Sequence, residues 1–233
     1  MPCQQAAHQE RAAKQARERD AAAARLVEQG KAKRLVPDPE RYPVVHMPAQ
    51  TRPLTPLSEK RRRAFVAHLD QLLAQSEIPP DAPPPPRPTA PGTLPVLLTP
   101  AQEAVSVQGC IGCGGACCQT GSTHAWQDLP SMVQYRRDHP SLSRDEVRAA
   151  YLARLGSAPT YADSCVYHGA TGCLLPREMR SWRCNTHWCG ELREVQRGMA
   201  GDERAGVFMV WPRGPGGWRG AFVTAEGARD VDG

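Results

Sequence analysis

Residues 110–118 read Cys110-Ile111-Gly112-Cys113-Gly114-Gly115-Ala116-Cys117-Cys118 and place four thiols within nine positions. Glycine and alanine separate most of these cysteines, and glycine tolerates the positive φ angles of a tight turn. The Cys-x2-Cys spacing lets two thiolates bind one ion across such a turn. The stretch therefore predicts a compact loop that directs several sulfur atoms toward a metal.

A second set of cysteines follows at Cys165, Cys173, Cys184 and Cys189, and the ninth cysteine is Cys3. Eight thiolates would fill two four-cysteine zinc sites, or one iron–sulfur cluster with a zinc site beside it. Adjacent side chains of an extended chain point to opposite faces, so we expect the vicinal pair to reach two different centres. The predicted metal ligands are Cys110, Cys113, Cys117, Cys118, Cys165, Cys173, Cys184 and Cys189.

Three histidines lie near these cysteines, and imidazole is an ordinary zinc ligand. They are His124, His168 and His187. Because eight thiols already suffice for two sites, we expect each histidine to be an ordinary loop residue. We also expect some of the arginines near the second set to donate hydrogen bonds to sulfur. These arginines are Arg177, Arg180, Arg183 and Arg193.

Composition sets the expected compartment and partners. No apolar run approaches the roughly 18 residues of a membrane span, and the charged N-terminus lacks the apolar segment of a secretory signal. We therefore expect a cytoplasmic protein without a membrane partner, in which clustered thiols stay reduced. Residues 101–233 carry 14 basic and 14 acidic side chains, so the net charge of +5 resides upstream. This balance disfavours a nucleic-acid partner for the cysteine-rich part.

The chain divides by composition into three expected segments. Residues 1–36 form a charged, alanine- and arginine-rich extension, helical or disordered, with too few large apolar side chains to bury a face. Residues 37–100 hold 16 of the 23 prolines and form a linker interrupted by a short amphipathic helix over 58–76. Residues 101–233 form the cysteine-cluster domain. Because that domain is rich in loops and poor in aliphatic residues, we expect metal binding to supply much of its folding free energy.

Helix-capping residues and the spacing of apolar residues predict several helices and a β-hairpin. Together these elements predict an α+β fold. In the 58–76 helix, one face carries Phe65, Leu69, Leu72 and Leu73. Helices are expected from Asp128 to Asp138, from a capping box at Ser143 to Gly156, and from Trp188 to Arg197 with Gly198 as terminator. Two apolar runs, 207–211 and 218–223, predict a C-terminal β-hairpin.

The cysteine pattern resembles the YkgJ-type cysteine-cluster family, a zinc- or iron-chelating domain related to the cluster in flagellin lysine N-methylases. The resemblance covers about residues 105–195. It matches the knuckle at Cys110 to Cys118, then Cys165, Gly172-Cys173, Arg180 and the pair Cys184 and Cys189. Ser181 stands where that family has proline, and Asn185 stands where arginine is common. The resemblance implies metal binding through the cysteines, with zinc or iron as the cofactor.

Two other functions compete with metal binding. By analogy with the methylases, the chain would be a protein-lysine methyltransferase or a redox enzyme. However, the sequence shows no glycine-rich cofactor loop and no paired general acid and base, so we assign no catalytic residue. Alternatively, it would be a zinc-stabilised nucleic-acid-binding module with a basic N-terminal arm. We expect a metal-binding protein whose protein partner the sequence does not identify.

Overall fold

The computed structural model describes residues 2–35, 41–77, 98–201, 205–214 and 217–231, with side chains except at 2–8 and 11. These residues form two compact units that interleave along the chain. The first unit comprises residues 1–51, 94–113 and 190–233, and the second comprises 52–93 and 114–189. The units therefore do not follow the consecutive segments expected from composition. The run Pro83–Pro86 lies outside the described residues.

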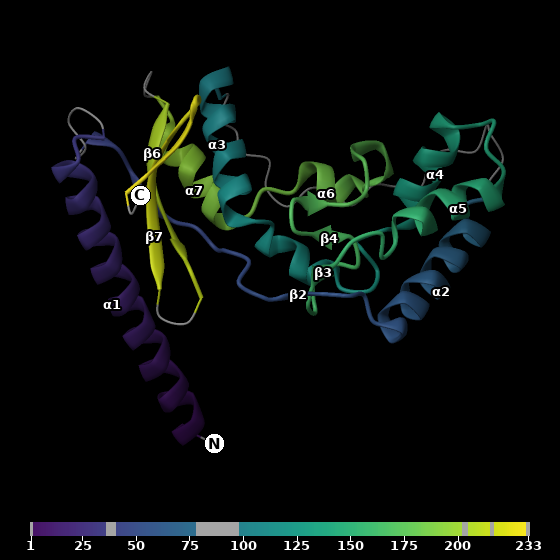
Figure 1. Cartoon of the computed structure of the whole chain (residues 1–233), viewed down its shortest axis with the longest axis horizontal. Coiled ribbons are helices and arrows are strands. Elements are labelled where there is room, and N and C mark those ends of the chain that lie inside the picture. Colours follow the sequence, from purple (N-terminus) through teal and green to yellow (C-terminus); the bar gives the residue numbers. More distant parts are fainter. Residues whose placement is uncertain (1, 36–40, 78–97, 202–204, 215–216, 232–233) are drawn as a thin grey trace. The chain divides into compact units, whose positions relative to one another are not determined.

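The first unit is built on a four-stranded sheet of order β1-β6-β7-β8, in which β1 is parallel to β6 and the other pairs are antiparallel. Its elements are α1 (Pro2–Ala32), β1 (Val44–His46), α3 (Pro100–Cys113), α7 (Gly190–Met199), β6 (Gly206–Pro212), β7 (Trp218–Thr224) and β8 (Gly227–Asp230). The predicted hairpin is confirmed as β6 and β7. Both faces of the strands are covered, by α1 on one side and by α3 and α7 on the other (Figure 1).

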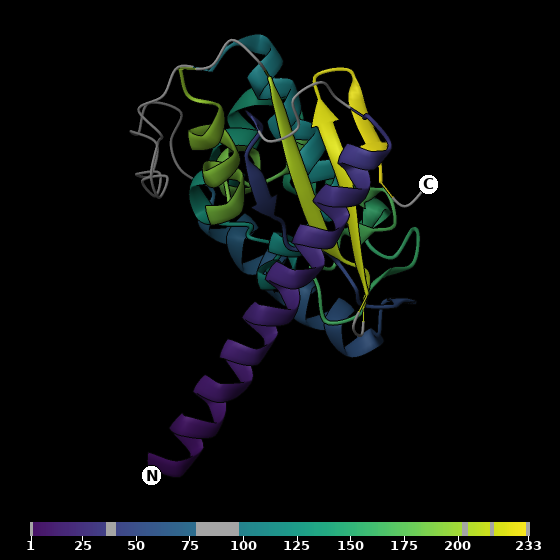
Figure 2. The same cartoon turned by 90° about the vertical axis from the view of Figure 1, so that its left-hand side faces the viewer.

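The helix α1 packs on the sheet, contrary to the expectation that residues 1–36 have little to bury. Ala22, Ala23 and Leu26 are all less than 10 % exposed. Gly220 on β7 permits this approach, because a methyl group there would lie 3.1 Å from Leu26 Cβ. Small alanines can bury a helix face against a strand that presents glycine, and a count of large apolar residues does not detect such a face. The N-terminal part of α1 extends beyond the strands (Figure 2).

The second unit combines helices with a small antiparallel sheet of order β2-β3-β4-β5. Its elements are β2 (Leu54–Thr55), α2 (Glu59–Gln75), η2 (Ala116–Gly121), α4 (Leu129–Asp138), α5 (Arg144–Arg154), β3 (Thr160–Tyr161), β4 (His168–Gly169), β5 (Gly172–Cys173), η3 (Arg177–Met179) and α6 (Trp182–Thr186). Three predicted helix starts are confirmed, with Ser58, Asp128 and Ser143 as N-caps of α2, α4 and α5. The α+β class is confirmed by the two units together.

The core of the second unit depends on α2, which comes from the proline-rich segment. Its apolar face, with Phe65, Leu69 and Leu73 fully buried, packs against α4 and α5. That face joins Met132, Tyr151 and other residues in one cluster. The expectation of a domain with little apolar interior was therefore wrong for this unit, because it counted only residues after 100.

The last predicted helix begins two residues later than expected and continues through its predicted terminator. The predicted first residue, Trp188, precedes α7 and is 38 % exposed, so it lies outside the buried face of the helix. Gly198 lies inside the helix, where an added methyl group would lie 3.0 Å from the Pro43 ring. Its small size serves helix packing rather than termination. Within the described residues, no helix is both long and apolar enough to cross a membrane.

Candidate metal centre

The 110–118 stretch divides between a helix and a turn. Cys110 and Cys113 lie in the last turn of α3, so the prediction that a tight turn joins them was wrong. The turn comes one residue later, where Gly114 and Gly115 adopt φ values of 63° and 75°. Gly112 serves the helix instead, because a methyl group there would lie 2.7 Å from Trp211 Cζ2.

The vicinal cysteines Cys117 and Cys118 lie in η2, a 3₁₀ helix, and not in an extended segment. The opposite-face argument for two separate centres therefore fails. Their side chains are hydrogen-bonded to one another, and the contact stabilises the Cys117 thiolate and lowers its pKa to about 7. The same contact, together with burial, raises the pKa of Cys118.

Cys165 connects the second cysteine set to this pair. Its backbone N–H donates to the Cys118 carbonyl at 3.0 Å, and its side chain is 8 % exposed. Burial raises the pKa of Cys165 to about 12. Arg61 of α2 opposes that shift with its positive charge and donates a hydrogen bond to the Ser164 carbonyl. Arg61 lies 104 positions upstream of Cys165, and no sequence signal connected the two.

Cys173 and Cys184 come from two further segments. Cys173 lies on β5, directly opposite His168 on β4. Cys184 lies in α6, where the Ser181 hydroxyl donates to its sulfur at 3.3 Å. Although Cys184 is exposed, the groups around it desolvate the thiol enough to raise its pKa, and the Ser181 hydrogen bond and the charge of Arg180 oppose that rise.

Five thiols of the second unit are electrostatically coupled. The charges of Cys165 and Cys173 both act on Cys118, and those of Cys117 and Cys173 both act on Cys184. These thiols therefore lie within Coulombic range of one another, and thiolates match zinc or iron in donor chemistry. Even so, no three Cys, His, Asp or Glu side chains in the described parts of the chain converge to hold an ion.

The three remaining predicted ligands are placed as follows. Cys110 is exposed and Cys113 is 6 % exposed, and both belong to the first unit. The carbonyl of Cys113 accepts a hydrogen bond from the Gln50 N–H at 2.9 Å. Cys189 is partly buried at the end of the second unit.

Hydrogen bonds hold His168 and His124 in the fold. His168 is 1 % exposed, and its Nδ1 and Nε2 lie 2.8 Å from Ser164 Oγ and the Gly114 carbonyl, respectively. His124 Nδ1 accepts from the Trp126 N–H at 3.1 Å. His187 is exposed.

Among the predicted arginine donors, Arg180 lies near the thiols. Its charge acts on Cys184, and its Nε donates to the Leu175 carbonyl at 2.9 Å. Arg183 instead lies over the Trp126 ring, 4.5 Å from its centroid. Arg61 and Ser181 were not predicted as site residues, although Ser181 stands at a departure from the pattern of the resembled family.

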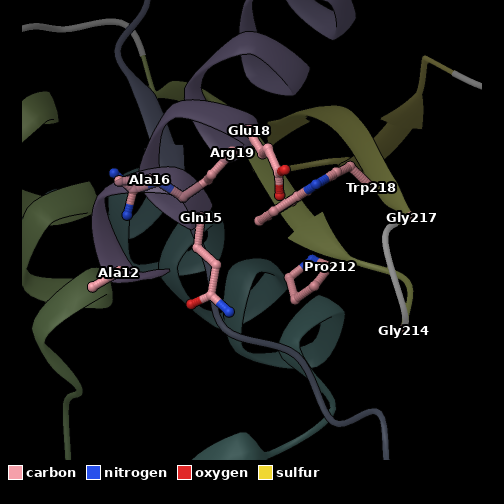
Figure 3. Close-up of a pocket in the computed structure, with 9 residues that line it drawn as sticks. All are labelled: Ala12, Gln15, Ala16, Glu18, Arg19, Pro212, Gly214, Gly217 and Trp218. Carbon is pink, nitrogen blue, oxygen red and sulfur yellow. The ribbon is translucent and has the colours of Figure 1, made fainter. Parts of the chain in front are cut away.

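A shallow hollow of about 490 Å³ lies in the first unit between α1 and the turn of the β6–β7 hairpin (Figure 3). Its lining comprises Ala12, Gln15, Ala16, Glu18, Arg19, Pro212, Gly214, Gly217 and Trp218. No cysteine or histidine contributes to this lining, so the hollow is not part of the candidate metal centre.

No family model, curated protein or solved structure matches the chain.

Proposed function

We propose that this protein is a metal-binding protein whose second unit chelates zinc or an iron–sulfur cluster through cysteine thiolates. The supporting observation is the electrostatic coupling of five thiols that come from four separate chain segments. These candidate ligands are Cys117, Cys118, Cys165, Cys173 and Cys184. Cys110, Cys113 and Cys189 remain ligands predicted from the sequence pattern, and the resemblance to the YkgJ-type family supports the same assignment.

The charges near the thiols fit this proposal. A zinc ion with four thiolates carries a net charge of about −2, which must be compensated where the site is partly buried. Arg61 and Arg180 both act on thiols of the group with positive charge. When bound, zinc would cross-link the four segments, whereas an iron–sulfur cluster would also carry an electron.

The surrounding scaffold also favours a site that forms within a folded unit. The backbone around the thiols is tied together by the hydrogen bonds from Cys165 to the Cys118 carbonyl and from His168 to the Gly114 carbonyl. Metal binding here would require the cysteine side chains to reorient, because no three ligating side chains converge in the described residues. A metal would thus add stability to a unit that already has an apolar core.

The test is metal and thiol analysis of full-length protein purified without oxygen. We expect stoichiometric zinc, or iron with sulfide and visible absorption, and fewer reactive thiols than the nine in the sequence. Serine substitution at Cys165 or Cys173 should lower the bound metal, whereas the matched control Cys3→Ser should not. Metal-free protein with nine reactive thiols, or with ordinary disulfides, would refute the proposal.

A further inference from the structure

The connection between η2 and α4, residues 121–127, has an unusual backbone conformation. Ser122, Ala125 and Trp126 have φ values of 37°, 52° and 57°, which residues other than glycine seldom adopt. Such a conformation is unfavourable for a side chain as bulky as tryptophan, and it persists only where neighbouring contacts enforce it. The contacts that hold Trp126 therefore determine the conformation of this connection.

His124 supplies a hydrogen bond that holds the backbone of Trp126. Its Nδ1 accepts from the Trp126 N–H at 3.1 Å, and the two ring centroids lie 5.3 Å apart. Because Nδ1 accepts, the proton of the neutral imidazole is on Nε2. A protonated imidazole carries an N–H on both nitrogens, so Nδ1 can then no longer accept. Protonation thus removes this hydrogen bond and sets two N–H groups against each other.

Other charged and titratable groups face this pair from the elements packed around it. His68 of α2 has its ring centroid 6.3 Å from that of His124, and its Nε2 lies 2.9 Å from the Gln127 carbonyl oxygen. Arg183 of α6 lies over the Trp126 ring. Two of the three groups facing His124 and Trp126 from outside the connection therefore carry, or gain in acid, a positive charge.

These surroundings favour the neutral form of His124. Burial is the main cause that lowers its pKa below the ordinary value of 6.5, the charge of His68 adds to this effect, and a hydrogen bond to the Thr120 carbonyl of η2 opposes it. The next acidic residue along the chain, Asp128, accepts from the Ser131 N–H as the N-cap of α4. An added proton on His124 is therefore met by repulsion as well as by the loss of a hydrogen bond.

The Trp126 ring connects η2 with α6, two segments that carry thiols. A methyl group at Gly121, the last residue of η2, would lie 3.0 Å from Trp126 Cδ1 and 3.2 Å from Cys165 Cβ. Arg183, which lies over the same ring, is the neighbour of Cys184 in α6. Movement of Trp126 would therefore loosen the connection between these segments.

We propose that His124 and Trp126 form an acid-sensitive latch in the second unit. The neutral imidazole holds Trp126 against η2 and α6, and protonation of Nδ1 releases the 121–127 connection. The latch belongs to the fold of the unit and does not rest on the proposed function.

The test follows the indole N–H signals of the five tryptophans by NMR on the ¹⁵N-labelled full chain, with Trp126→Phe to assign one of them. Between about pH 7.5 and about pH 5, the range in which histidine ordinarily titrates, the Trp126 signal should change with a midpoint below 6.5. The signals of Trp211 and Trp218 in the first unit should not change with it.

Three variants test the assignment to His124. His124→Asn should abolish the change, because the asparagine side-chain oxygen accepts from a backbone N–H two residues on and does not titrate. His68→Gln should raise the midpoint, since it removes a neighbouring positive charge. His46→Asn is the matched control, because burial also lowers the pKa of His46 but this residue lies in the first unit.

Three results would overturn the proposal. The first is a Trp126 signal that does not respond to pH in the unchanged protein. The second is a response that persists in His124→Asn or is altered as much by His46→Asn. The third is a simultaneous change of all five tryptophan signals, because that marks global unfolding rather than release of the connection.

Discussion

His168 Nε2 lies 2.8 Å from the Gly114 carbonyl oxygen and joins the turn after α3 to the strand opposite Cys173. A carbonyl can only accept, so Nε2 carries the proton and Nδ1 accepts from the Ser164 hydroxyl. Both ring nitrogens are thus engaged, and a neutral imidazole satisfies both contacts. This arrangement makes His168 a connection between the two cysteine sets rather than a substitute for a thiolate.

Removal of this imidazole should destabilise the metal-free protein. In His168→Ala the Gly114 carbonyl and the Ser164 hydroxyl lose their partner, and an unsatisfied buried group costs about 1–3 kcal/mol. We expect a loss of about 2–4 kcal/mol in the free energy of unfolding, measured by urea denaturation. His187→Ala is the comparison: because this side chain is exposed, its loss should lower that free energy less than the loss of the buried His168. Equal effects of the two substitutions would contradict the structural role.

Acid should destabilise the protein through the same residue. Burial lowers the pKa of His168 below its ordinary value of 6.5, so the folded state binds this proton more weakly than the unfolded chain does. The stabilisation is complete above about pH 6.5 and is lost as the pH falls, by at most about 1.4 kcal/mol per pH unit for one proton. Denaturation at several pH values from about 7.5 to about 5 gives the free energy of unfolding as a function of pH. That free energy should fall less steeply for His168→Gln than for the unchanged protein. Parallel pH profiles would show that His168 does not titrate with folding.

Alkali should destabilise the metal-free, reduced protein, because the folded state holds certain thiol and phenol protons more tightly than the unfolded chain does. Burial raises the pKa of Cys165 to about 12 and also raises the pKa values of Tyr151 and Tyr167. The folded state retains these protons, so stability is complete below the ordinary values of about 9 for cysteine and about 10 for tyrosine and is lost as the pH rises. Tyr167→Phe removes one of the groups and should reduce the loss between about pH 9.5 and 11. An unchanged slope in that variant would contradict the prediction.

The contact between α3 and β6 requires glycine at position 112. A methyl group there would lie 2.7 Å from Trp211 Cζ2, and that ring is fixed because Arg219 lies over it at 4.8 Å. Although alanine gains about 1 kcal/mol in helix propensity, we expect Gly112→Ala to destabilise the protein by about 1–3 kcal/mol through overpacking. Gly190→Ala in α7 is the control, since nothing lies within 4 Å of its added methyl group. Thermal unfolding should show opposite shifts for the two variants, and a stabilised Gly112→Ala protein would contradict the close packing.

The capped helices and the hairpin could be predicted from the sequence, because the residues that start and stop these elements lie within a few positions of them. Ser58, Asp128 and Ser143 each cap the helix that follows, and the spacing of Phe65, Leu69 and Leu73 places one apolar face on α2. The cysteine spacing likewise identified a set of thiols, since ligand type is a property of the residues themselves.

Tertiary structure alone decided what these elements pack against and which side chains meet the thiols. The apolar face of the 58–76 helix favoured docking on the cysteine-bearing part, and α2 does complete that core. The sequence could not show that Arg61 acts on Cys165 or that Gly112 accommodates Trp211. Each of these contacts joins residues far apart in the chain, and their partners are chosen by shape and burial rather than by local propensity. Residue identity therefore set the chemistry available to this protein, whereas long-range packing set where that chemistry is gathered.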